Sequence, residues 1–282
     1  MSAGNDKRLT LVPTPVGNLS DITQRALEVL AEADVVAAED TRHSRTLLDR
    51  YAIDTRLERL DAHTMESRAK PLLEKYEHVA YITDAGTPGI SDPGAELVRI
   101  AVSMGVQVEV LPGPTAFVPA LVESGLPTAR FMFEGFLPRK GSERKRRLRS
   151  VAAATATSII YESPNRLLGT LEDLQQECGS ERSGSVSREL SKLHHETVRG
   201  TLADLVERFR ERPAKGEIVI VVGPAPESEG EVGRPDEVAS LLAGAGVQGR
   251  LLREALSALG VPRNEAYKLA LAHSEPGPDE PN

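Results

Sequence analysis

Short runs of consecutive apolar residues alternate with helical stretches along the first 125 residues. Val35–Ala38 and Val79–Ile82 are runs of four apolar residues, and Leu9–Val12 is apolar apart from Thr10; this length is typical of buried strands. Between the first two runs, Ile22, Ala26, Val29, Leu30 and Ala33 recur at helical spacing, and Ser20 or Asp21 is the predicted helix cap. The alternation continues with Leu57–Leu60, a helix at Glu66–Glu77, a helix at Pro93–Met104 and the run Val106–Leu111. This pattern predicts an α/β domain over residues 1–125.

The pattern changes near residues 124–130, where Ser-Gly-Leu-Pro breaks the preceding helix, and we expect a domain boundary there. Strands are predicted at Ser158–Tyr161, Ser185–Arg188, Glu196–Arg199 and Glu217–Val222, and helices at Pro164–Gln176 and Leu202–Arg210. Because strands outnumber helices, residues 126–224 are expected to form a second α/β domain around a mixed sheet. The rest divides into a linker at 225–235, a small helical tail at 236–273 and a disordered end at 274–282.

Three of the predicted strands of the first domain end in loops rich in proline and glycine, which begin at Pro13, Asp84 and Pro112. The longest, Asp84–Gly94, contains three glycines, two prolines and two aspartates. Glycine allows close backbone approach and proline restricts φ, while the carboxyl ends of strands in open α/β sheets form the ligand crevice. We therefore expect the three loops to converge on one site.

Composition narrows the class of protein. The chain has 282 residues, one cysteine and a net charge of −8, so an intrachain disulfide is impossible and a reducing, cytoplasmic setting is expected. The first apolar stretch is too short for a signal or a membrane span. His194-His195-Glu196 lacks a third ligand at metal-site spacing, and we expect no metal site.

Positive charge is concentrated in one segment of this acidic chain, Arg139–Arg149. Such a block either neutralises phosphates of a polyanion or forms a solvated helix face. On the first alternative the predicted RNA-binding residues, including one arginine further along the chain, are Arg139, Lys140, Arg144, Lys145, Arg146, Arg147 and Arg166.

Seven motifs occur in an order that resembles the tetrapyrrole methylase family, and within it the group that methylates a cytidine 2′-oxygen of 16S ribosomal RNA in the small subunit. They are Thr14–Ile22, Glu39–Arg42, Asp84–Gly94, Pro112–Ala116, Tyr161–Arg166, Arg188–Lys192 and Lys215–Val219. The resemblance covers roughly residues 8 to 224. It implies two α/β domains, a homodimer and S-adenosylmethionine bound in a cleft between the domains. The absence of G-x-G-x-x-G after the first strand agrees with a fold other than the dinucleotide-binding one.

The resemblance also implies which residues contact the cofactor: Pro15, Asp84, Gly86, Thr87, Pro88, Gly89, Ile90, Thr115, Ala116, Tyr161, Glu217 and Ile218. Methyl transfer to a hydroxyl requires orientation of the two reactants, together with a base for the proton or a cation for the developing alkoxide. Candidates next to strand ends are Glu39, Asp40, Arg42, Glu189 and Lys192, and we favour Glu189 and Lys192. A structural ion-pair cluster is the other interpretation of those two residues.

The residues are also compatible with two other functions. The same cofactor loops serve methyltransferases that act on small tetrapyrroles, for which a few arginines inside the cleft would suffice. The chain could also be a non-catalytic module that binds the cofactor or rRNA during subunit assembly. The exposed basic block favours the rRNA methyltransferase. The tail carries Arg250, Arg253, Arg263 and Lys268, which suit RNA contact, although packing or dimerisation explains it as well.

Overall fold

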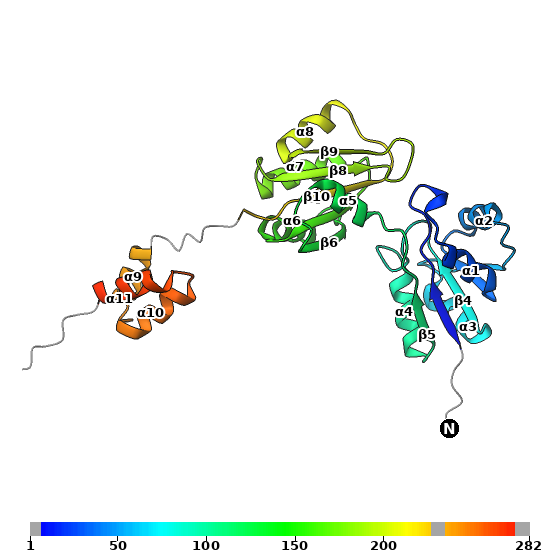
Figure 1. The fold of residues 1–282 in the computed structure, drawn as a ribbon, viewed down its shortest axis with the longest axis horizontal. Helices are drawn as coiled ribbons and strands as arrows, with labels where there is room; N and C mark the ends of the chain where they lie inside the picture. Colours follow the sequence, from blue (N-terminus) through cyan, green and yellow to red (C-terminus); the bar gives the residue numbers. More distant parts are fainter. Residues whose placement is uncertain (1–6, 227–234, 274–282) are drawn as a thin grey trace, which may run out of the picture. The chain divides into compact units, whose positions relative to one another are not determined.

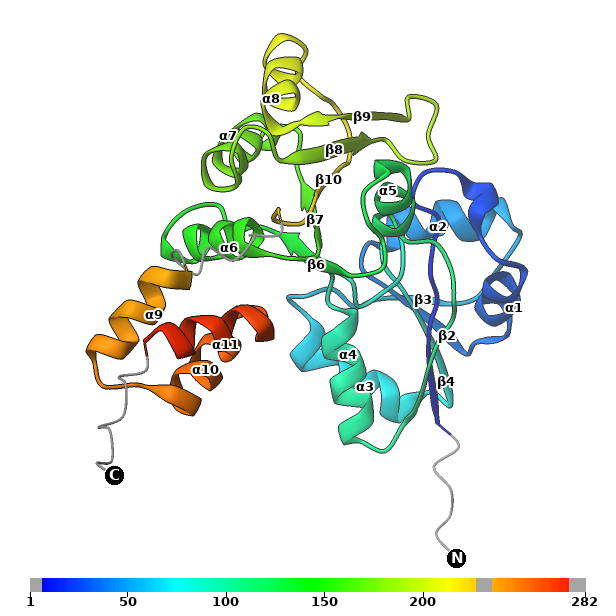
Figure 2. The same ribbon diagram turned by 60° about the vertical axis from the view of Figure 1, so that its left-hand side comes forward.

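The structure is a computed structural model that describes residues 7–226 and 235–273. The predicted disordered end and most of the predicted linker lie outside these residues. Residues up to Ala225 form one compact unit, and the remainder forms a second. In the first unit, two five-stranded sheets follow one another along the chain (Figures 1 and 2). None of the helices in the described segments is long and apolar enough to cross a membrane.

The first sheet is entirely parallel, in the order β3-β2-β4-β1-β5. Its strands are β1 (Arg8–Leu11), β2 (Val35–Ala38), β3 (Leu57–Arg59), β4 (His78–Ile82) and β5 (Gln107–Val110). The helices are α1 (Gln24–Glu32), α2 (Thr41–Arg50), α3 (Met65–Lys75) and α4 (Gly94–Ser103). Alternate residues of β4 face opposite layers: Val79 and Tyr81 pack with α3 and α4, whereas Ala80 and Ile82 pack with α1 and α2.

Two local features differ from the sequence prediction. Neither Ser20 nor Asp21 caps α1; both lie in the 3-10 helix η1 (Leu19–Asp21), and the cap is Thr23, whose hydroxyl accepts a hydrogen bond from the Ala26 amide. Helix α2 was not predicted because its sequence is strongly polar, and it begins directly after Asp40, whose carboxylate accepts from the Arg42 amide. In both places the helix start is defined by a side chain that accepts from a free amide.

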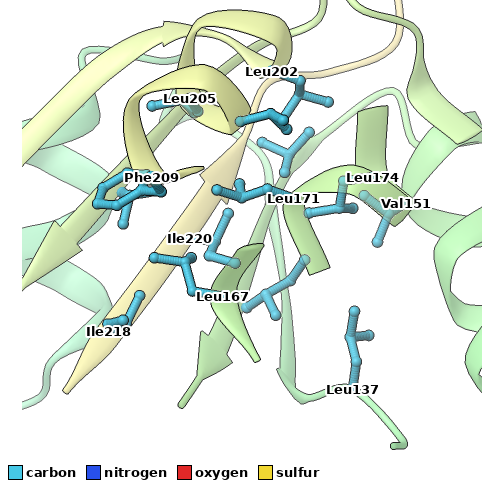
Figure 3. Packing of buried hydrophobic residues seen from close by; sticks show 14 of the residues in the cluster. Leu137, Val151, Leu167, Leu171, Leu174, Leu202, Leu205, Phe209, Ile218 and Ile220 are labelled. Carbon is cyan, nitrogen blue, oxygen red and sulfur yellow. The ribbon is translucent and has the colours of Figure 1, made fainter. Parts of the chain in front are cut away.

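The second sheet is mixed, in the order β6-β7-β10-β8-β9, and only the β6–β7 pair is parallel. Its strands are β6 (Phe131–Phe136), β7 (Thr157–Glu162), β8 (Ser183–Arg188), β9 (Glu196–Thr201) and β10 (Ile218–Val222). Helices α6 (Ser142–Ala153), α7 (Leu167–Cys178) and α8 (Leu202–Glu211) cover one face. Figure 3 shows Leu167, Leu171, Leu205 and Phe209 packed around Ile218 and Ile220 on that face.

The other face of the second sheet is covered by α5 (Phe117–Ser124), which packs on Val219 and Val221 through Ala120 and Leu121. Because side chains of β10 alternate, Ile218 and Ile220 face α7 and α8 while Val219 and Val221 face α5. The boundary expected at residues 124–130 therefore follows a helix that already belongs with the second sheet in space.

The described part of the second unit contains three helices, α9 (Pro235–Gly244), α10 (Gly249–Ala258) and α11 (Arg263–Ala272). Ala239, Leu252, Leu256, Val261, Ala266 and Ala270 form its core. Residues 235–273 of this unit contain four acidic residues and four arginines and lysines, so this segment carries no net positive charge.

Candidate functional site

The three proline- and glycine-rich loops meet at the carboxyl edge of the first sheet and are tied together by hydrogen bonds. Thr14 and Gly86 exchange two backbone hydrogen bonds of 3.0 and 2.9 Å. The Thr87 hydroxyl donates to the Pro114 carbonyl at 3.0 Å. A Cβ on Gly113 would lie 2.6 Å from Pro13 Cβ, so this close approach requires glycine. The loops thus form one connected surface.

A cavity of about 520 Å³ lies between these loops and the edge of the second sheet. Nine of the twelve residues predicted to contact the cofactor line this cavity: Asp84, Gly86, Thr87, Ile90, Thr115, Ala116, Tyr161, Glu217 and Ile218. Pro15, Pro88 and Gly89 do not line the cavity, but each is next in sequence to a residue that does. The second sheet contributes through the ends of β6 and β7, the segment after β8 and the start of β10.

Asp92 holds the Asp84–Gly94 loop in shape. Its Oδ1 accepts hydrogen bonds from the amides of Gly89 and Gly94, both at 2.7 Å. Gly86 and Gly89 adopt φ of 81° and 98°, in the left-handed region that glycine favours. Asp92 therefore has a structural role in the loop in addition to contributing negative charge to the cavity.

Glu39 is the only one of the five acid–base candidates that lines the cavity. Burial raises the pKa of its carboxyl group, and the negative charges of Asp84 and Asp92 raise it further. By contrast, Asp40 caps α2 and pairs with Arg42 at 3.2 Å, and the Arg42 side chain is 91% exposed. Adjacent residues at the end of β2 thus have different surroundings.

Glu189 and Lys192 lie in the segment after β8, beside the cavity rather than in its lining. Lys192 Nζ lies 3.0 Å from Glu189 Oε1 and 3.2 Å from Glu217 Oε2, and Glu189 Oε1 also accepts from the Glu217 amide at 3.1 Å. The hydrogen bond from Lys192 lowers the pKa of Glu189. Burial acts to lower the pKa of Lys192, but contacts with Glu189 and Glu217 outweigh it and the pKa is raised. Both groups are consequently charged at neutral pH.

The predicted RNA-binding residues fall into two groups. Arg144 donates hydrogen bonds to Asp173 and Thr170, and its side chain is only 11% exposed. Arg147 forms an ion pair with Glu134. Arg166 donates to the Leu137 carbonyl and forms an ion pair with the buried Glu162. These three hold the second domain together. Arg139, Lys140, Lys145 and Arg146 are exposed, and Arg146 pairs with Glu143.

Phe136, which was not predicted to lie at the site, forms an aromatic wall on the second-sheet side together with Tyr161, which was predicted to contact the cofactor. Phe136 and Tyr161 line the cavity, and their rings meet edge to face with centroids 5.7 Å apart. Phe133 contacts Tyr161 at 4.9 Å. Gly135 inside an otherwise β-type run is the signal that could have indicated this wall, because an isolated glycine in a strand pattern marks a bulge. Burial raises the pKa of Tyr161 to about 12, so its phenol stays protonated.

Features that resemble other chemistry have structural explanations. His195 Nε2 lies within hydrogen-bonding distance, 2.9 Å, of the Oε2 atom of Glu123, a residue of α5. Cys178 is the last residue of α7, and burial raises the pKa of its thiol. Within the described residues, no three His, Cys, Asp or Glu side chains come together in a way that could hold a metal ion.

Comparison with known proteins shows the family to which this chain belongs. The family profile described as Tetrapyrrole (Corrin/Porphyrin) Methylases matches residues 8–206, and the chain belongs to that family. Ribosomal RNA small subunit methyltransferase I of Synechocystis sp. is 44% identical over 93% of this chain and 97% of that protein. The protein of the same name from Escherichia coli is 42% identical over 96% of this chain and 97% of its own.

Solved structures show the same fold at lower identity. The uroporphyrin-III C-methyl transferase of Thermus thermophilus, solved with S-adenyl homocysteine, has a TM-score of 0.56 and 23% identity, covering 76% of this chain and 96% of that one. A cobalt precorrin-4 methyltransferase reaches a TM-score of 0.59 at 18% identity, covering 79% of this chain and 97% of its own. The fold class expected from the sequence is confirmed.

Proposed function

We propose that this protein transfers a methyl group from S-adenosylmethionine to the ribose 2′-oxygen of a cytidine in 16S rRNA of the small ribosomal subunit. The observation that carries the proposal is the cavity where the linked loops meet the second sheet, in a chain 42–44% identical to two small subunit rRNA methyltransferases. Backbone-rich loops suit a reaction whose main requirement is to hold two reactants in line.

The charge of the cavity fits this cofactor. Glu39, Asp84 and Asp92 all line it, and the raised pKa of Glu39 reflects burial and the unfavourable proximity of the other two carboxylates. A cationic ligand would relieve that repulsion. S-adenosylmethionine supplies a methyl group on a positively charged sulfur, and transfer forms a carbon–oxygen bond as the carbon–sulfur bond breaks.

The remaining requirement is a group that takes the hydroxyl proton, and we assign it to Glu39. It lines the cavity, and a pKa raised above the ordinary carboxyl value makes it a stronger base than Asp40 or Glu189, whose pKa values are lowered. Lys192 stays protonated beside the cavity, where it suits an anionic phosphate or a developing alkoxide.

We propose that the rRNA contacts the surface formed by Arg139, Lys140, Lys145 and Arg146. The first three make no ion pair with any described residue, so their charge is available to phosphates. Arg144, Arg147 and Arg166 contribute indirectly by holding this part of the fold. The second unit, which has no net positive charge, is better suited to packing or to protein contact than to phosphate binding.

We further propose that the protein acts as a homodimer in the cytoplasm, where its ribosomal substrate is found. Val118 and Val122, one turn apart on α5, are 46% and 65% exposed and provide apolar surface for a second copy. Light scattering coupled to size exclusion would give twice the chain mass; a single chain mass at micromolar concentration would contradict the dimer.

The test is transfer of labelled methyl from S-adenosylmethionine to small subunits from a strain that lacks this protein, with nuclease mapping of the label. Label in a 2′-O-methylated cytidine of 16S rRNA supports the proposal, and Glu39→Gln is the matched variant that should bind cofactor without transfer. Cofactor binding by the wild-type protein without transfer to subunits would contradict the proposal.

A further inference from the structure

Strand β6 contains a bulge that changes the direction of its last residue. Phe133 pairs with Ile159, but the next paired residue, Gly135, is opposite Ile160, so Glu134 is the extra residue. In a regular strand Phe133 and Phe136 would face opposite sides of the sheet. With the bulge, the rings of both residues contact Tyr161, at centroid distances of 4.9 and 5.7 Å.

The backbone conformation of Gly135 and two hydrogen bonds from Arg147 define the bulge. Gly135 has a φ of 59°, which glycine adopts without strain, and a Cβ there would lie 3.2 Å from Ser91 Oγ in the Asp84–Gly94 loop. Arg147 donates to both the carboxylate of Glu134, at 2.7 Å from Nε, and the Glu134 carbonyl. The Glu134 side chain is 12% exposed, so this ion pair is shielded from solvent. The bulge is therefore a defined part of the cavity wall.

The result of the bulge is an aromatic ring that lines the cavity yet remains 53% exposed. Its edge-to-face contact with Tyr161, at an interplanar angle of 65°, leaves ring surface of Phe136 for another planar group. Three and four residues further along the chain are Arg139 and Lys140, two exposed cations without ion-pair partners among the described residues. An open ring followed by free cations is the combination that binds a base together with its neighbouring phosphates.

We infer that the ring of Phe136 stacks on the target nucleobase and so positions its ribose in the cavity, with Arg139 and Lys140 on the flanking phosphates. This inference rests on the proposed rRNA methyltransferase function and adds a positioning residue to it. Stacking requires the base to leave its own stack, as for other enzymes that act on single nucleotides within a polymer. The glycine loops and carboxylates of the first sheet remain the place for the cofactor.

The test compares Phe136→Ala with Phe131→Ala, a matched variant at the other end of the same strand. Phe131 is 44% exposed and does not line the cavity. Stacking on one base is worth about 1–3 kcal/mol, so Phe136→Ala should raise KM for small subunits about 5- to 150-fold. Because stacking is present in both ground and transition states, kcat should change little. Phe136→Trp should restore KM, and cofactor affinity measured by calorimetry should be unchanged.

A spectroscopic measurement distinguishes stacking from a structural role. In an rRNA fragment with pyrrolocytosine at the mapped target, the fluorescence of the bound fragment should be lower with the wild-type protein than with Phe136→Ala, because only the wild-type ring stacks on the base. Equal KM values for Phe136→Ala and Phe131→Ala, or a loss of cofactor affinity in Phe136→Ala, would overturn the inference while leaving the methyltransferase function intact. Failure of the wild-type protein to methylate subunits would instead contradict the proposed function.

Discussion

Replacing Asp92 with alanine tests whether one carboxylate determines the shape of the cofactor loop. The substitution removes the acceptor of two hydrogen bonds of 2.7 Å from the amides of Gly89 and Gly94. Gly94 is buried and Gly89 half-buried, so water cannot freely replace the lost partner. A hydrogen bond to a charged group contributes about 1.5–3 kcal/mol. Since both bonds share one oxygen, we expect Asp92→Ala to lower the free energy of unfolding by about 2–4 kcal/mol.

Asp92→Asn is the matched control because it keeps an oxygen acceptor and removes only the charge. Both variants take the same negative charge away from Glu39, so the difference between them isolates the two hydrogen bonds. We expect Asp92→Asn to cost about 1 kcal/mol, a typical value for a weakened polar contact. Urea unfolding of the full chain, followed by circular dichroism, measures both.

Cofactor affinity gives a second readout of the same substitution. The loop forms one wall of the cavity, so an Asp92→Ala protein must reorder it before binding, and each 1.4 kcal/mol of that cost lowers affinity about tenfold. Calorimetric titration with S-adenosylmethionine should show at least a tenfold weaker Kd than for Asp92→Asn. If the two variants unfold within about 0.5 kcal/mol of each other and bind equally, the assigned role of Asp92 is wrong.

Three further predictions follow from individual contacts. Glu39→Gln should abolish methyl transfer but retain cofactor binding. Because burial and the Asp84 charge raise the pKa of Glu39, ionisation of Glu39 lowers the stability of the fold as pH rises through that pKa. In thermal unfolding from pH 4 to 8, the variant should lose this part of the dependence of stability on pH. An unchanged slope would contradict the raised pKa. Replacing Arg139, Lys140 and Lys145 together with Glu should reduce the slope of log affinity for subunits against log salt concentration by about 2–3. The control Arg250→Glu, at an exposed arginine of α10, should leave the slope unchanged. Equal slopes for the two variants would exclude this surface as the rRNA contact. Gly17→Ala places a Cβ 2.5 Å from the Leu190 carbonyl oxygen and 2.5 Å from Lys192 Cγ. It should destabilise the fold by about 1–3 kcal/mol and lower kcat. If the variant unfolds with the same free energy as the wild-type protein, the close packing of these loops is wrong.

Much of the fold could be predicted because its signals are local. Val35–Ala38 has the same bounds in the structure as in the prediction, and the predicted strands and helices differ from the observed ones by a few residues at their ends. Apolar strands and glycine-rich turns depend mainly on neighbouring residues, so the loop positions at Pro13, Asp84 and Pro112 were readable. The predicted start of α1 was wrong because three polar residues within four positions, Ser20, Asp21 and Thr23, could each cap a helix.

The roles of the charged residues were decided only by tertiary structure. The sequence places Glu39 beside Asp40, and Arg144 beside Lys145, with nothing to distinguish the members of each pair. In the folded chain Glu39 lines the cavity while Asp40 caps α2, and Arg144 is paired with Asp173 while Lys145 is exposed. A charged side chain's role depends on partners that lie far away in the sequence, since burial and Coulomb interactions act through space. The sequence by itself therefore determined the strands, the loops and the family, whereas only the tertiary structure decided which side chains face the cavity.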